Sequence, residues 1–227
     1  MLIVLEGLDG AGKSTQVRML REYLESVCPR VEYIHFPRYD APVYGELISR
    51  FLRGDFGSIE SVHPQLVALL FAEDRHSAAP AIKEALEDGS TVLLDRYVYS
   101  NIAYQCAKLR SPREAESLRQ WILDTEYGQF NLPRPDLNLF LDVPISFVER
   151  SLSAQRDGDD REYLHGGSDI HEASIDFQRR VRDLYRGQAS KDPSFITVGC
   201  SDSDGQMLAA ENIFSKIKEI YENRKEN

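Results

Sequence analysis

The residues best suited to chemistry lie near the start of the chain, in segment 7–15, which reads Gly-Leu-Asp-Gly-Ala-Gly-Lys-Ser-Thr. This is the pattern G-x-x-x-x-G-K-[ST], whose glycines let the backbone wrap a phosphate group with its N–H groups. Lys13 can reach the β- and γ-phosphates of a nucleotide, and Ser14 can ligate Mg²⁺. The residues predicted to bind the nucleotide are Gly7, Asp9, Gly10, Ala11, Gly12, Lys13, Ser14 and Thr15.

The sequence on either side supports this interpretation. An apolar run at 2–5 predicts a strand before the loop, and helical spacing of apolar residues over 17–27 predicts a helix after it. The N-terminus of that helix adds a dipole that favours phosphate. An ordinary glycine-rich turn is the alternative, but a chain of this length matches the bare pattern by chance only about one time in a hundred.

The rest of the chain alternates between strand and helix patterns. Apolar runs predict further strands at 31–36, 91–94, 137–141 and 195–198. Periodic segments predict helices at 43–52, 64–86 (one helix, or two joined near Pro80), 99–109, 113–127, 145–155, 170–188 and 207–223. Segment 157–168 is rich in Gly and Asp and is predicted to be a mobile loop. The order predicts one α/β domain over 1–227, with a doubly wound, mostly parallel five-stranded sheet flanked by helices.

Polar and aromatic residues follow two of these strands. Segment 36–39 reads Phe-Pro-Arg-Tyr, and segment 95–97 reads Asp-Arg-Tyr. Ligands of doubly wound sheets bind at the carboxyl ends of the strands. We therefore expect both segments to lie at one ligand-binding edge together with the glycine-rich loop.

Two helices add groups that could bind a nucleobase. Phe71 and Arg75 are four residues apart on one face of the helix at 64–86, so that one could stack and the other donate hydrogen bonds. Segment 100–105 places Ser-Asn and Tyr-Gln three to four residues apart on another helix. Asn and Gln amides offer both a donor and an acceptor, which suits the edge of a base.

Each of these residues also has a structural interpretation. Phe71 could belong to the core with its leucine neighbours, and Arg75 could be solvated or paired with Asp74 or Glu73. Asp95 and Arg96 could form a structural ion pair, and Tyr39 could close a loop. The functional interpretation gains weight because all of them converge on the edge that carries the phosphate-binding loop.

Composition limits the possible partners. The chain has 227 residues, of which 42% are hydrophobic and 28% charged, and a formal net charge of −10. This charge argues against a nucleic-acid surface and requires clustered arginines to hold any anionic substrate. The separated cysteines Cys28, Cys106 and Cys200 are expected to be free thiols. With no apolar run near the roughly 20 residues that span a bilayer, and no signal peptide expected before the strand at Leu2, we predict a cytoplasmic protein.

The motifs at 6–15, 36–39, 71–75 and 95–104, in this order and spacing, resemble those of thymidylate kinases. The resemblance runs from residue 2 to about residue 185. It implies a P-loop kinase fold with a mobile lid at about 157–168, the substrates ATP and dTMP, Mg²⁺ as cofactor, and a homodimer formed through the helices after residues 64 and 98. It also implies transfer of the γ-phosphoryl group of ATP to the 5′-phosphate of dTMP for dTTP synthesis.

The resemblance also implies roles for individual residues. Arg38 and Arg96 would hold the acceptor phosphate, and Asp95 would place Mg²⁺ together with Ser14. Asp9 would lie near the sugar. Phe71 would stack on thymine, with Arg75 bonded to its O4, and Tyr104 would leave no room for a 2′-hydroxyl. Further substrate-binding residues are expected at Phe36, Tyr39, Ser100, Asn101 and Gln105.

This chain differs from some of the enzymes that it resembles at Gly10 and at His171. Some thymidylate kinases carry an arginine at the loop position held here by Gly10, and the resemblance implies that lid arginines then supply the missing charge. Arg156 and Arg161 are the candidates, with Arg150 on the helix before them. His171 stands where similar enzymes often carry the tyrosine of an Asp-x-Tyr motif, which leaves its role open.

The chemistry needs no general base, because the acceptor phosphate is largely ionised near neutral pH. Three alternatives remain. A regulatory GTPase would need an Asn-Lys-x-Asp motif, which the sequence lacks. Adenylate kinases usually have Gly where this chain has Ser14. A deoxynucleoside kinase would usually need a carboxylate base for a neutral 5′-hydroxyl.

Overall fold

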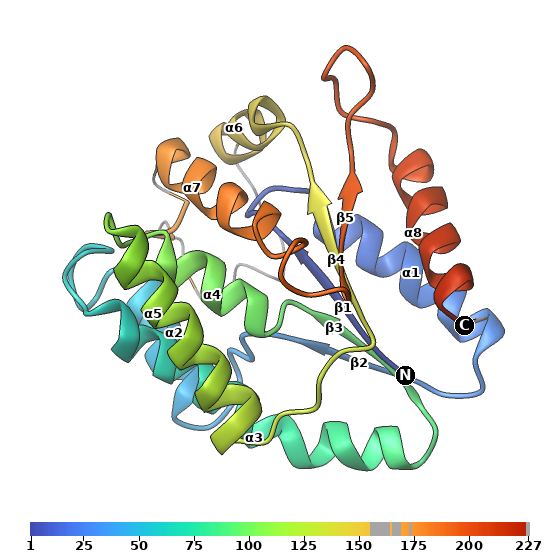
Figure 1. Ribbon diagram of the computed structural model, residues 1–227, viewed down its shortest axis with the longest axis horizontal. Helices are drawn as coiled ribbons and strands as arrows, with labels where there is room; N and C mark the ends of the chain where they lie inside the picture. The colour runs from blue at the N-terminus through green and yellow to red at the C-terminus, as the bar shows by residue number, and fades with distance from the viewer. Residues whose placement is uncertain (155–163, 165–168, 173, 226–227) are drawn as a thin grey trace.

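The computed structural model describes residues 1–154, 164, 169–172 and 174–225. One sheet of five parallel strands crosses the molecule in the order β2-β3-β1-β4-β5 (Figure 1). The strands are β1 (Leu2–Gly7), β2 (Val31–His35), β3 (Thr91–Asp95), β4 (Leu137–Asp142) and β5 (Phe195–Gly199). The predicted doubly wound, five-stranded sheet is confirmed.

Helices cover both faces of the sheet. They are α1 (Lys13–Val27), α2 (Tyr44–Leu52), α3 (Pro64–Glu87), α4 (Val98–Cys106), α5 (Pro112–Leu123), α6 (Ile145–Ser153), α7 (Ile175–Arg186) and α8 (Ala210–Lys225). Helices α1 and α8 pack on one face, while α3, α4 and α7 pack on the other, with α5 outside α4 (Figure 1). Strands β1, β3 and β4 are therefore buried almost throughout, which explains their continuous apolar runs.

Of the two arrangements predicted for α3, the single helix is confirmed, whereas α5 differs from the prediction. Helix α3 continues through Pro80 as one helix, with the proline ring on its exposed side. Helix α5 ends at Leu123, and the predicted last turn is instead a π-helix, η1 (Asp124–Gln129). This wider turn carries Glu126, which is fully buried against α3 through an ion pair with Arg75. Glu126 thus forms its long-range ion pair from the segment where the α-helix widens into a π-helix. Helical periodicity does not reveal such a pair.

The last two helices begin later than predicted. Segment 169–172 is not helical, because the N–H of Ile170 donates to the carbonyl of Leu52 (2.9 Å), and the side chain of Gln178 donates to the carbonyl of His171 (2.9 Å). Helix α7 starts only at Ile175, after the capping hydroxyl of Ser174. Helix α8 starts at Ala210, because Met207 still bridges to Ser201 in an antiparallel contact.

Several predictions lie outside the described residues. They include Arg156, Arg161 and the lid at 157–168, of which only Leu164 is described. Cys28, Cys106 and Cys200 are free, as predicted. A search of the described residues finds no helix that is both long enough and apolar enough to cross a membrane.

Candidate active site

The glycine-rich loop connects β1 to α1 at the carboxyl edge of the sheet. Gly10 and Gly12 have φ angles of 72° and 75°, a left-handed conformation that side chains with a Cβ rarely adopt. The loop lets α1 begin at Lys13, so that the helix N-terminus opens into a cleft of about 820 Å³. The expected nucleotide-binding residues that line this cleft are Asp9, Gly10, Ala11, Gly12, Lys13, Ser14 and Thr15.

A smaller cavity of about 70 Å³ adjoins this cleft. The expected substrate residues that line it are Asp9, Phe36, Tyr39, Phe71, Arg75, Arg96, Ser100, Asn101, Tyr104 and Gln105. Asp9, Pro37, Tyr39 and Arg96 line both cavities and so mark their junction. Of the described residues predicted for the site, Gly7 and Arg38 line neither cavity.

Arg38, expected at the acceptor phosphate, bonds to residues of α3 and lines neither cavity. Its Nε donates to Asp74 Oδ1 (3.0 Å), and its Nη2 donates to the Asp74 carbonyl (2.7 Å) and to the hydroxyl of Ser77. Asp74 is almost fully buried, so its carboxylate needs this cation. The structure thus places Arg38 against α3 rather than in the site.

Arg75 is neither solvated nor paired with its sequence neighbours. It donates two hydrogen bonds to Glu126, from Nε (2.5 Å) and Nη2 (2.7 Å), and both side chains are buried. Such a two-point pair fixes the plane of the guanidinium group at the cavity wall. Phe71, one helical turn earlier, is half-buried: it lines the cavity and also packs against the apolar cluster of α2 and α3, so its position is compatible with both interpretations of this residue.

Two amide oxygens at the cavity wall have no hydrogen-bond partner within the part of the chain that the structure describes. The side chain of Asn101 donates to the carbonyl of Ala68 and to Glu126 (both 2.9 Å), which leaves its Oδ1 buried with no partner among the described residues. The Oε1 of Gln105 is likewise buried and has no hydrogen-bond partner among the described residues. Buried acceptors of this kind are costly unless a ligand supplies a donor.

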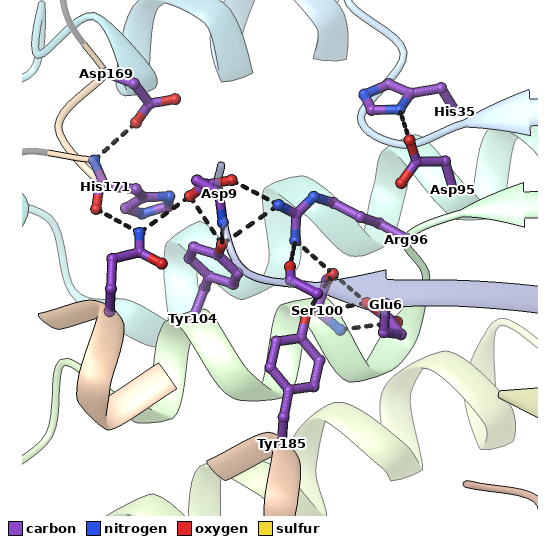
Figure 2. A network of polar contacts seen from close by, with 12 residues as sticks. Glu6, Asp9, His35, Asp95, Arg96, Ser100, Tyr104, Asp169, His171 and Tyr185 are labelled. Carbon is purple, nitrogen blue, oxygen red and sulfur yellow. Dashed lines mark hydrogen bonds and ion pairs between the residues drawn. The ribbon is translucent and has the colours of Figure 1, made fainter. Parts of the chain in front are cut away.

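Arg96 connects the two cavities. Its Nη2 donates to Asp9 Oδ1 (2.6 Å) and its Nη1 donates to Ser100 (3.2 Å), as Figure 2 shows. Nη1 also donates to the Gly7 carbonyl (2.8 Å). Tyr104 donates to the other oxygen of Asp9 (2.8 Å). Burial raises the pKa of Asp9, but Arg96 and Lys13 outweigh it and bring the pKa down to about 2. Asp9 is therefore ionised at neutral pH.

Asp95 does not pair with Arg96, so the interpretation of these neighbours as a structural ion pair is wrong. One oxygen of Asp95 bonds to His35 Nδ1 (3.1 Å), and the other, Oδ1, is buried without a partner among the described residues. Burial raises the pKa of Asp95, but Lys13 and His35 outweigh it and bring the pKa down to about 2. Burial lowers the pKa of Lys13, and Asp95 counteracts the decrease.

His171 lies at the wall of the smaller cavity. Its ring stacks on Phe177, with centroids 5.6 Å apart, and lies 5.1 Å from the ring of Tyr104. Burial lowers the pKa of His171 well below its usual value, which keeps the imidazole neutral. The backbone N–H of His171 donates to Asp169 (2.7 Å), so this pair holds the segment before α7 in place (Figure 2).

Sequence reasoning missed a set of residues that support or line the site. They are Glu6, His35, Glu126, Glu172, Gln178 and Tyr185. Glu6 lies directly before the loop, in a strand that is otherwise apolar. A charged residue at a position expected to be buried could have identified Glu6 as a residue with a role at the site. The others lie far along the chain from their partners, and no spacing rule connects them.

Comparisons with known proteins agree on one family. The family model described as thymidylate kinase matches residues 5–210. A thymidylate kinase of Mycobacterium tuberculosis is 32% identical over 213 residues, covering 92% of this chain and 96% of the relative. One of Bifidobacterium longum is 34% identical over 224 residues, covering 97% and 98%. The solved structure of thymidylate kinase from Candida albicans has a TM-score of 0.69 and 29% identity, and covers 99% of this chain and 92% of that one.

Proposed function

This chain belongs to the thymidylate kinase family, and from that premise we propose how its site transfers the γ-phosphoryl group of ATP to the 5′-phosphate of thymidylate. The larger cleft takes the phosphates of ATP, and the smaller cavity takes thymidylate. The observation that carries this proposal is the junction of the two cavities at Asp9 and Arg96. There, donor and acceptor phosphates can meet in line without a covalent intermediate.

Thymine enters the smaller cavity between Phe71 and the amides of α4. Its ring stacks on Phe71, its O4 accepts from Arg75, and its N3–H donates to one of the unpartnered oxygens of Asn101 and Gln105. Cytosine presents an amino group in place of O4 and an acceptor in place of N3–H. Bound cytosine would therefore leave the Arg75 donor and the amide oxygen acceptor unpaired, which disfavours its binding.

Replacing the stacking ring tests this pose. We expect Phe71→Ala to weaken thymidylate binding by about 1–3 kcal/mol, the range for a base stacked on an aromatic side chain. ATP affinity should barely change, because Phe71 does not line the larger cleft. Calorimetric titration of each ligand measures both effects.

Leu86→Ala is the matched control, since Leu86 lies on the same helix but packs on the main core, outside both cavities. It should lower the melting temperature without changing either affinity. If Phe71→Ala behaved like this control, with thymidylate affinity unaltered, Phe71 would be only a core residue.

The phosphates are neutralised and positioned by Lys13 and Arg96. Lys13 lies among the loop amides on the ATP side, and Arg96 reaches the junction from β3. The acceptor phosphate is largely ionised near neutral pH, so no side chain has to remove a proton. Arg38 would contact this phosphate only by giving up its bonds to Asp74 and Ser77.

Mg²⁺ is the cofactor that the site fits. The described residues contain no cluster of three His, Cys, Asp or Glu side chains that could hold a metal by themselves. They do offer Ser14 at the cleft and the unpartnered Oδ1 of an ionised Asp95, and Mg²⁺ sites of this kind take their other ligands from substrate phosphates and water. Bound there, Mg²⁺ would neutralise charge that develops on the phosphates.

We further propose that residues 1–227 form one domain and that the protein lies in the cytoplasm, where its three cysteines stay reduced.

We also propose a homodimer that forms through α3. Helix α3 exposes Leu66 and Leu69, with exposed fractions of 62% and 37%. The helix after residue 98, α4, cannot share in this interface, because every one of its residues is buried within the subunit. Sedimentation at micromolar concentration, repeated with Leu66→Glu, separates a dimer from a monomer.

A further inference from the structure

Glu6 is a fully buried carboxylate to which the transfer scheme above assigns no role. It lies in the central strand β1, directly before the phosphate-binding loop, and its exposed fraction is 0%. Burial raises the pKa of Glu6, and a buried carboxyl group is costly unless hydrogen-bond donors satisfy its oxygens. Four donors do so, and they come from α4, its N-terminal flank and α7.

One oxygen of Glu6 caps helix α4 from outside. The backbone N–H groups of Tyr97 (3.0 Å) and Ser100 (3.2 Å) both donate to Oε1. Helices normally satisfy such first-turn donors with a side chain at the N-cap, and here the N-cap residue, Tyr97, makes no side-chain cap. Glu6 therefore fixes the start of the helix that carries Asn101, Tyr104 and Gln105.

The other oxygen of Glu6 is connected to Arg96 through one hydroxyl. Ser100 Oγ donates to Glu6 Oε2, and Arg96 Nη1 donates to the same Ser100 Oγ (3.2 Å), as Figure 2 shows. Tyr185 also donates to Oε2 (2.9 Å). Ser100 Oγ also lies 2.7 Å from the hydroxyl of Tyr185. Because Tyr185 and Ser100 both donate to Glu6 Oε2, the carboxylate orients the Ser100 hydroxyl so that its acceptor side faces Arg96.

Arg96 needs such support because its backbone is strained. Its φ angle is 69°, in the left-handed region that residues with a Cβ seldom occupy. The next N–H along the chain, that of Tyr97, is one of the two that Glu6 holds. Strained residues persist only where the surrounding structure fixes them, and Glu6 holds both the backbone next to Arg96 and the side chain that bonds its guanidinium.

We propose that Glu6 is a positioning residue for phosphoryl transfer, which holds Arg96 at the junction of the two cavities by capping α4 and orienting the hydroxyl of Ser100. The proposal rests on the function given above, in which Arg96 contacts the acceptor phosphate. It adds a residue on the far side of Arg96 from the substrate, which affects turnover without touching either ligand.

Glu6→Gln tests the proposal with nearly unchanged shape. The amide keeps one acceptor for the backbone N–H groups, but it places an N–H₂ group opposite Ser100 and Tyr185, so that the hydroxyl of Ser100 must turn. We expect kcat to fall at least about tenfold, the effect of losing one hydrogen bond to a charged group. The KM for thymidylate should rise, and the dissociation constant of ATP should no more than roughly double.

Asp136→Asn is the matched control. Asp136 accepts a hydrogen bond from the backbone N–H of Leu2 (2.8 Å) at the opposite end of the same strand, and it lines neither cavity. Like Glu6→Gln, this substitution replaces a carboxylate with an amide, in this case the carboxylate that bonds to the first residue of β1. It should therefore lower the melting temperature and leave kcat unchanged. If Glu6→Gln also left kcat within about twofold of the wild type at a lowered melting temperature, Glu6 would be a stability residue only, and the proposal would be wrong.

Ser100→Ala decides the matter if Glu6→Gln does not fold. It leaves the carboxylate and both backbone caps in place and removes only the hydroxyl between Glu6 and Arg96, so kcat should again fall at least about fivefold, the central value for the loss of one hydrogen bond. An unchanged kcat in this variant overturns the proposal. Wild-type protein that fails to phosphorylate thymidylate would instead overturn the function on which it rests.

Discussion

Replacing Lys13 by alanine is expected to remove most turnover and leave thymidylate binding nearly intact. Lys13 is the first residue of α1, lines the larger cleft and does not line the smaller cavity. Lys13 is half-buried in the loop, where its interaction with the phosphates of ATP is stronger than it would be in bulk water. Losing one preorganised cation or donor of this kind costs about 10²–10³ in kcat.

The measurement is a steady-state kcat with a calorimetric titration of thymidylate. Lys83→Ala, on α3 and outside both cavities, is the control for loss of a lysine and should change neither value. A Lys13→Ala variant that lost thymidylate affinity but retained its turnover would show that the donor and acceptor sides have been assigned the wrong way round.

The second large effect is expected when an arginine of the predicted lid is replaced. The structure around Gly10 indicates why the charge would have to come from outside the loop. A Cβ added at Gly10 would lie 2.9 Å from the Ser151 hydroxyl and 3.3 Å from Leu152. Side chains of α6 would have to shift to admit a side chain at position 10, and the left-handed φ of 72° there adds strain for any residue with a Cβ. Apart from Lys13, the loop at 7–15 holds no cation, and the chain leaves α6 toward segment 155–168 at this same rim.

We therefore expect Arg156→Ala or Arg161→Ala to lower kcat at least about a hundredfold with little change in KM, since such an arginine is worth about 10³–10⁵ in comparable transfers. Arg156 is our first choice because it lies nearest the end of α6. Both residues lie outside the described part of the chain, so the prediction rests on the loop and on α6.

Arg224→Ala is a suitable control for loss of charge, because Arg224 lies near the end of α8 and lines neither cavity. It should leave kcat unchanged. Single alanine substitutions at Arg150, Arg156 and Arg161 that each kept kcat within about twofold would mean that the lid supplies no charge to the transition state.

Local patterns were sufficient to predict the fold and most of the residues that line the two cavities of the candidate site. Continuous apolar runs identified the strands, because β1, β3 and β4 are buried by helices on both faces. Polar residues placed directly after a strand, such as Asp95 and Arg96, did come together at one edge, because the ends of parallel strands meet there.

Contacts between distant residues could not be predicted in this way. Arg75 pairs with Glu126, 51 residues later in the chain, and Arg38 pairs with Asp74, 36 residues later. Periodicity describes one element at a time, so it carries no information on which charges two elements bring together. The same limit hid Glu6, whose donors lie about 90 residues or more away, and the late start of α7, which depends on a bond from Ile170 to Leu52.

Phosphoryl transfer to a panel of acceptors tests the central claim most directly. The purified protein would be given ATP and Mg²⁺ with dTMP, dUMP, GMP, AMP, CMP or thymidine in parallel, and the ADP and the phosphorylated products would be measured. We expect dTMP to be converted to dTDP with the highest kcat/KM of the panel, and thymidine to remain unphosphorylated. A protein that phosphorylated thymidine, or that preferred GMP to dTMP, would contradict the account.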